Sequence, residues 1–239
     1  MSGRTEGTIE VVEEAELAQR AAEWLAARLA AAAAARGSCS LAVPGGRSPL
    51  PIYRALLASP LREQVPWAAL TLYFGDERCV PPDHPESNYA GALEHLVRPA
   101  GLDPARQVRR MEAERADLDQ AAADYAALLP ERLDVLFLGL GEDGHTASLF
   151  PGSPALAERA RRVTPIEGAP KPPPRRLSIT PPVIEAARDV LVVVSGAGKA
   201  QAAARALRAG DVPAALARGG TWLLDRAAAA ALERTEGES

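Results

Sequence analysis

The sequence predicts an α/β fold with a mainly parallel sheet flanked by helices. Stretches rich in Val, Ile and Leu recur along the chain between turn residues, and segments with helical spacing lie between them. The four strongest stretches are almost entirely apolar, as strands covered on both faces should be. The length of 239 residues, with 47% hydrophobic and 24% charged residues, suits a single globular domain spanning 1–239.

The expected strands follow these apolar stretches in chain order. They cover residues 8–12, 38–43, 70–74, 133–138, 177–180, 190–194 and 222–224. The first helix is expected over 15–36, where Leu17, Trp24, Leu25 and Leu29 form one apolar stripe. Shorter helices are expected over 50–57, 88–97, 118–129, 199–208 and 225–232. The proline-rich stretch 168–174 predicts a stiff surface loop rather than a flexible linker.

Charge and hydropathy argue against several classes of partner. The net charge is −4, so no general basic field is available to hold nucleic acid or an anionic membrane. The longest uncharged apolar run, 29–35, is far shorter than the roughly 20 residues of a membrane-spanning helix. The first residues do not lead into the apolar core of a secretory signal, so we expect a soluble cytoplasmic protein. Cys39 and Cys79 belong to no CxxC or Cys/His cluster, and we expect two core thiols and no zinc site.

The loop after the second expected strand is a candidate anion site. Ligands of open α/β sheets bind beyond the carboxyl ends of the strands, so the loops at those ends are considered first. This loop reads Pro44-Gly45-Gly46-Arg47-Ser48-Pro49 and opens a helix. Two glycines allow a ligand to approach the backbone closely, and the amides that open a helix bind an anion without a lysine. A tight turn with Pro49 at the first helical position explains the same segment without a ligand.

A charged segment follows the strand that ends at Phe74. Asp76, Glu77 and Arg78 stand side by side, and three adjacent side chains cannot all face the same way. One or two could enter the cleft, as an orienting carboxylate and as a guanidinium that stabilises a developing oxyanion. A solvated charged turn is the alternative. Further along, Ser87 or Asn88 fits a helix cap as well as a substrate contact.

The loop over 139–152 carries the strongest candidate for a general base. His145 follows a buried strand, and a free imidazole pKa of about 6.5 suits proton transfer near neutral pH. Asp143 or Glu142 could orient its ring. The other histidines of the chain, His84 and His95, fall in a loop and on an expected helix, where exposure to solvent is the default.

The fourth candidate segment supplies cations. Arg175 and Arg176 precede the strand expected at 177–180, and Lys199 follows the strand 190–194 in the sequence Ser195-Gly196-Ala197-Gly198-Lys199. An arginine fork and a lysine point charge both suit a phosphate group. A charged helix start is the alternative for Lys199.

Two nucleotide-binding patterns are rejected. The glycines at 139, 141 and 144 have GxGxxG spacing, but the acidic residue expected on the following strand is missing and the segment lies in the middle of the chain. The segment 195–199 lacks the spacing of a Walker motif. We therefore expect neither nicotinamide binding nor nucleotide hydrolysis.

Taken together and in this order, the four segments resemble the 6-phosphogluconolactonase family. The likeness runs from Val43 to about Asp225. It rests on the segments 45–49, 76–78, 80–81, 87–89, 139–151, 171–180, 198–200 and 222–225. Each segment alone is a weak signal, whereas the ordered set is specific.

The resemblance implies a Rossmann-like domain, similar to the glucosamine-6-phosphate deaminase fold, that acts without a metal or other cofactor. It implies hydrolysis of 6-phospho-D-glucono-1,5-lactone to 6-phosphogluconate, the second step of the oxidative pentose phosphate pathway. By position, His145 would activate water, Arg78 would face the lactone oxygens, and Asp76 and Asp143 would order the site. The phosphate would be held by Gly45, Gly46, Arg47, Ser48, Arg176 and Lys199. Relatives often carry a small hydroxyl residue in place of Arg47.

Two other readings and the oligomeric state stay open at this point. A glucosamine-6-phosphate deaminase would share the fold, but deaminases resemble one another in an Asn-Glu-Pro after the histidine, where this chain has Thr146-Ala147-Ser148. A sugar-phosphate sensor would carry a fused output module, for which the chain has no room. The partner expected is a small sugar-phosphate lactone, with a monomer slightly favoured over an oligomer.

Overall fold

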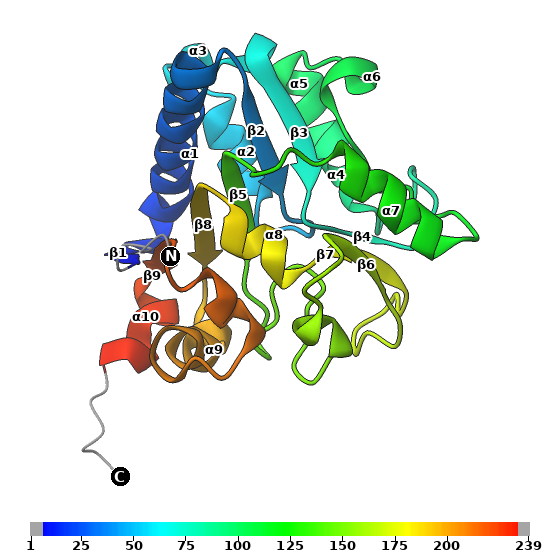
Figure 1. The fold of residues 1–239 in the computed structure, drawn as a ribbon. Helices are drawn as coiled ribbons and strands as arrows, with labels where there is room; N and C mark the ends of the chain where they lie inside the picture. Colours follow the sequence, from blue (N-terminus) through cyan, green and yellow to red (C-terminus); the bar gives the residue numbers. More distant parts are fainter. Residues whose placement is uncertain (1–6, 234–239) are drawn as a thin grey trace.

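A parallel sheet of six strands forms the centre of the computed structural model, which describes residues 7–233 (Figure 1). The strand order is β1-β9-β8-β5-β2-β3, and every neighbouring pair is parallel. Its strands are β1 (Thr8–Val12), β2 (Cys39–Val43), β3 (Leu70–Phe74), β5 (Val135–Gly139), β8 (Asp189–Val194) and β9 (Thr221–Asp225). All six were expected from their apolar sequences, with ends within two residues of those expected.

A second, antiparallel sheet lies beside the first and was not expected. It contains β4 (Asp76–Arg78), β7 (Arg176–Ile179) and β6 (Val163–Ile166), in the order β4-β7-β6. The strand expected at 177–180 therefore belongs to this small sheet and not to the parallel one. The charged turn considered for 76–78 is wrong, because these residues form a strand whose two carboxylates are buried.

Helices cover both faces of the parallel sheet (Figure 1). They are α1 (Glu14–Arg36), α2 (Leu50–Leu56), α3 (Leu61–Gln64), α4 (Asn88–Ala92), α5 (Arg98–Ala100), α6 (Pro104–Gln107), α7 (Leu118–Leu128), α8 (Pro181–Ala186), α9 (Ala200–Ala204) and α10 (Arg226–Glu233). Shorter 3₁₀ turns cover Trp67–Ala69, Pro154–Ala157, Ala197–Lys199 and Pro213–Ala217. The expected helix 88–97 is interrupted by a π turn, Leu93–Val97, and a second π turn, Arg205–Ala209, extends α9.

The core is divided by the parallel sheet into two layers. Strand β2 is buried along its whole length, with Ala42 packed into one layer and Leu41 and Val43 into the other. Helix α1 contributes Leu25 to the second layer, and α7 contributes Tyr125 to the first. Burial of both faces explains why the central strands have no polar alternation. Within residues 7–233, no helix is both long and apolar enough to cross a membrane.

Because the strands of the main sheet are parallel, the carboxyl ends of β2, β3, β5 and β8 meet at one edge. The loops at 44–49, at 139–149 and at 195–199 begin there, and β4 starts directly beyond β3. This edge gathers the four segments that the sequence singled out.

Candidate active site

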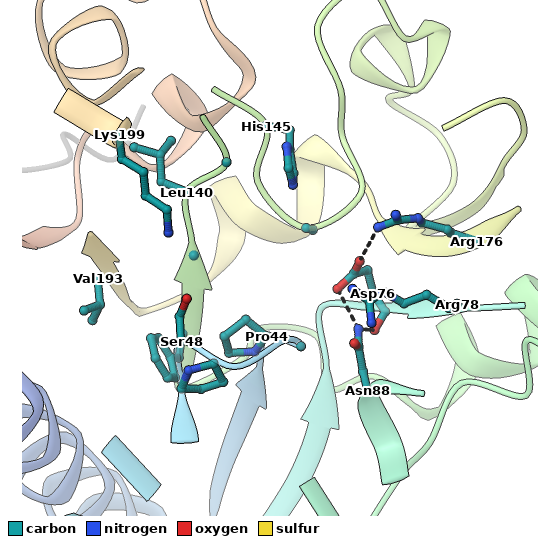
Figure 2. A pocket seen from close by; sticks show the side chains of 16 residues that line it. Pro44, Ser48, Asp76, Arg78, Asn88, Leu140, His145, Arg176, Val193 and Lys199 are labelled. Atoms are coloured by element: carbon teal, nitrogen blue, oxygen red, sulfur yellow. Dashed lines mark hydrogen bonds and ion pairs between the residues drawn. The ribbon is translucent and has the colours of Figure 1, made fainter. Parts of the chain in front are cut away.

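An open cavity lies at the carboxyl ends of the strands of the parallel sheet (Figure 2). The lining residues are Pro44, Gly45, Ser48, Pro49, Asp76, Arg78, Asn88, Phe137, Gly139, Leu140, Gly141, His145, Ala147, Arg176, Val193 and Lys199. All four candidate segments therefore contribute side chains or backbone to one cavity.

His145 forms a close pair with Asp143. Its Nδ1 lies 2.5 Å from Asp143 Oδ1, and its amide donates to the same oxygen over 3.2 Å. Burial acts to raise the pKa of Asp143, but the hydrogen bonds from His145 outweigh it and the pKa is lowered. An ionised carboxylate only accepts hydrogen bonds, so in the neutral imidazole the proton is on Nδ1 and Nε2 is an acceptor. Of the two acids considered for this contact, the structure places Asp143 there.

The residues of this loop pack around the imidazole of His145 on several sides. A Cβ at Gly141 would lie 2.1 Å from His145 Nδ1, so only glycine fits beside the ring. Thr146 Oγ1 donates to the Gly139 carbonyl over 3.0 Å. On another side the Phe150 ring lies 4.6 Å from the imidazole, centroid to centroid. The ring is therefore fixed before any ligand arrives.

Asp76 lies at the centre of a buried polar network. Asp76 is only 6% exposed. Its Oδ1 accepts a hydrogen bond from Asn88 Nδ2 over 3.1 Å, and its Oδ2 accepts one from Ser148 Oγ over 2.6 Å. Arg176 Nη1 lies 4.0 Å from the same Oδ2 and donates to Ser148 Oγ over 3.4 Å. Ser148 is not among the predicted site residues, because its only signal in the sequence is its place in the loop of His145.

Glu77 faces the other side of β4 and stabilises the start of α4. Its carboxylate accepts from the backbone amides of Arg78, Asn88 and Tyr89 and from the Ser87 hydroxyl. Burial raises its pKa, although these hydrogen bonds act in the opposite direction. Ser87 Oγ also accepts from the Ala90 amide, so Ser87 is a helix cap.

Arg78 and Arg176 are direct partners across the β4–β7 pair. Arg78 lines the cavity, donates from Nη1 to the Glu86 carbonyl over 2.7 Å, and has a buried Nε without a partner. Arg176 donates to the carbonyls of Lys171 and Pro173 in the proline-rich loop. Burial lowers the pKa of Arg176, and the nearby Arg78 acts in the same direction.

Lys199 approaches the cavity from the opposite side (Figure 2). It ends the 3₁₀ turn that follows β8, and Asp225 Oδ2 holds this turn by accepting from the Gly196 amide over 2.8 Å. Burial lowers the pKa of Lys199, while Glu142 acts in the opposite direction. Arg175 is exposed and pairs with Glu167, away from the cavity lining.

The glycine-rich loop enters the cavity with only part of its length. Gly45 and Ser48 line it, whereas Gly46 and Arg47 are exposed and lie outside the lining. Gly46 has a φ of +82°, a conformation that favours glycine. The contacts expected for Gly46 and Arg47 are therefore the weakest of the predicted set.

No group of three or more His, Cys, Asp or Glu side chains is placed to hold a metal ion between residues 7 and 233. Both cysteines have free thiols, Cys39 buried and Cys79 half-buried. Burial raises the pKa of each thiol to about 11, so neither is a thiolate nucleophile near neutral pH.

Comparison with known proteins supports a specific family. Residues 12–224 match the family model of glucosamine-6-phosphate isomerases/6-phosphogluconolactonase. A 6-phosphogluconolactonase of Streptomyces coelicolor is 43% identical over 92% of each chain. The solved 6-phosphogluconolactonase of Trypanosoma brucei is 29% identical, with a TM-score of 0.81 over 95% of this chain and 99% of that one.

The fold is shared more widely than these names. A solved monomeric glucosamine-6-phosphate deaminase superposes with a TM-score of 0.80 over 94% of this chain and 99% of that one, at 22% identity. That likeness concerns the fold alone. Because the family model matches residues 12–224 and a curated relative is 43% identical, the chain belongs to the glucosamine-6-phosphate isomerase/6-phosphogluconolactonase family.

Proposed function

We propose that this protein hydrolyses 6-phospho-D-glucono-1,5-lactone to 6-phosphogluconate in the cytoplasm, without a metal ion. The observation that carries the proposal is the His145–Asp143 pair, which lies in one cavity with Lys199, Arg176 and Arg78. A base and several cations suit a substrate with an uncharged lactone carbonyl at one end and an anionic phosphate at the other. The relatives that carry this name support the same reaction.

Binding would place the two ends of the substrate at different parts of the cavity. Lys199, Arg176, Ser48 and Gly45 hold the phosphate, with Lys199 as a point charge and Arg176 as a fork. The lactone carbonyl then lies toward His145 and Arg78. Asp76 neutralises part of the positive charge near Arg176 and keeps that side chain in place.

The reaction uses His145 first as a base and then as an acid. Nε2 removes a proton from water as the water oxygen bonds to the lactone carbonyl carbon, and Arg78 stabilises the oxyanion that forms. Collapse of this intermediate breaks the bond between the carbonyl carbon and the ring oxygen. The imidazolium returns its proton to that oxygen, which becomes a hydroxyl, and the new carboxylic acid ionises to the carboxylate.

Replacing the proposed base tests this function. We expect His145→Ala to lower the enzymatic rate by roughly 10²–10⁴-fold, the usual contribution of a general base. The rate is measured as loss of freshly generated lactone, corrected for spontaneous hydrolysis. His95→Ala is the matched control, because His95 is half-buried and lies outside the cavity lining. Near-normal turnover by a folded His145→Ala protein would contradict the proposal.

The same preparations separate the competing functions. Ammonia release from glucosamine-6-phosphate, without lactone hydrolysis, would indicate a deaminase. Binding of 6-phosphogluconate without turnover of either substrate would indicate a sensor. We expect neither result, because no carboxylate follows His145 within 146–151 and because the base is already aligned by Asp143.

A further inference from the structure

Asn88 lies between two parts of the candidate site (Figure 2). It is the first residue of α4, and its Nδ2 donates to the Asp76 carbonyl over 2.8 Å and to Asp76 Oδ1 over 3.1 Å. On its other side is the glycine-rich loop. A Cβ added to Gly45 would lie 1.7 Å from Asn88 Oδ1 and 2.1 Å from Asn88 Cγ. The amide of Asn88 therefore fills the space that a side chain at position 45 would need.

The two glycines of the loop are required for different reasons. Gly46 has the positive φ that disfavours other residues, and a Cβ there would meet nothing within 4 Å. Gly45 is outside the positive-φ region, so its backbone would accept alanine. The three atoms nearest to a Cβ at position 45 all belong to the Asn88 side chain.

Asn88 is itself held rigidly. The residue is 4% exposed, and its backbone N–H donates to Glu77 Oε1 over 2.7 Å. The Asp76 carbonyl and carboxylate oxygens only accept, which fixes the amide with Nδ2 toward Asp76 and Oδ1 toward Gly45. Oδ1 is buried and has no hydrogen-bond partner, so its contact with the loop is one of shape.

We propose that Asn88 is a positioning residue, which fixes the glycine-rich loop at a set distance from Asp76. Through this contact it would hold the glycine-rich loop in register with β4, which carries both Asp76 and Arg78. The kinetic part of this inference rests on the proposed function. The packing between Asn88 and Gly45 does not.

A mutant cycle separates the shape of Asn88 from its hydrogen bonds. Gly45→Ala is introduced into wild-type protein, into Asn88→Ala, which vacates the space, and into Asn88→Leu, which fills it without donating. We expect Gly45→Ala to raise KM about tenfold in wild type and in Asn88→Leu, and less than about threefold in Asn88→Ala, as for residues in direct contact. The change in kcat should be smaller than the change in KM, since the loop contacts the phosphate in both ground and transition states.

Thermal unfolding of the same variants gives a readout that does not depend on activity. Gly45→Ala should lower the midpoint in wild type and leave it nearly unchanged in Asn88→Ala. Equal effects of Gly45→Ala in all three backgrounds, on both KM and midpoint, would overturn the inference. If wild-type protein fails to hydrolyse the lactone, the proposed function fails, while the unfolding cycle still decides whether Asn88 and Gly45 are coupled.

Discussion

Lys199 should lose its positive charge at a lower pH than an ordinary lysine does. Burial lowers its pKa, so the protonated form is lost as pH rises through a value below the usual 10.5. We therefore expect the affinity for 6-phosphogluconate to fall over that alkaline range. Calorimetric titration at a series of pH values measures it, and Lys199→Arg should remove the dependence because a guanidinium stays charged.

The other lysine of the chain provides the control for this experiment. Lys171 is exposed in the proline-rich loop and does not line the cavity. Lys171→Arg should keep the wild-type pH dependence. The same fall of affinity in Lys199→Arg as in wild type would show that another group titrates.

The sequence predicts the role of a site residue when that residue is of a distinctive type and follows a predicted strand. His145 and Asp143 are of this kind, since few other residues suit a base and its orienting acid. Ser148 and Asn88 are common types whose importance comes from contacts to Asp76, 72 and 12 residues away in the sequence. Such contacts depend on how β4, α4 and the loop of His145 pack together, which no local pattern contains.

At the level of elements, Glu77 links β4 to α4. Replacing it with Gln turns one acceptor oxygen into a donor that faces backbone amides, and leaves buried N–H groups unpaired. We expect Glu77→Gln to lower the free energy of unfolding by about 1–3 kcal/mol, the cost of unsatisfied buried donors. Urea unfolding followed by circular dichroism measures the change.

Ser87→Ala is a useful comparison for this variant. It removes the cap to the Ala90 amide and one of the four hydrogen bonds to Glu77, and should cost only about 1 kcal/mol because the three backbone amides keep their carboxylate. A Glu77→Gln protein no less stable than Ser87→Ala would show that the four hydrogen bonds to Glu77 are replaced by others or by water.

The elements found from sequence are those whose burial is uniform. The strands of the parallel sheet are covered on both faces, so their apolar runs are easy to identify. Strands β4 and β6 are short. All three residues of β4 are charged, and two of them are buried, where they make hydrogen bonds and an ion pair. A charged triplet has the composition of a turn, and only its pairing with β7 makes it a strand.

In the whole molecule, the two edges of the parallel sheet have different roles. The cavity lies at the carboxyl edge, whereas Asp134 lies at the amino edge, where its Oδ2 accepts from the amide and hydroxyl of Ser40. Its Oδ1 pairs with Arg36 over 2.7 Å. This cluster ties β2 to β5 away from the proposed chemistry.

Asp134→Ala should therefore separate stability from activity. We expect the free energy of unfolding to fall by about 2–3 kcal/mol, because the buried groups of Ser40 lose their acceptor. In the folded protein, kcat and KM for the lactone should stay within about twofold of wild type, as is usual for distant sites. A large loss of kcat at unchanged stability would contradict this division of the sheet.

The pairing of Arg78 with Arg176 makes ligand binding and folding interdependent. Two like charges stand opposite each other in β4 and β7, and Lys199 adds a third cation to the same cavity. Like charges directly opposite destabilise a strand pair, and bound 6-phosphogluconate, with its phosphate at Arg176 and its carboxylate at Arg78, would relieve that repulsion. We expect 6-phosphogluconate at about a hundred times its Kd to stabilise the protein by about 2.7 kcal/mol, visible as a rise in the unfolding midpoint. Metabolite supply would then regulate how long each molecule survives heat and proteolysis as well as how fast it turns over.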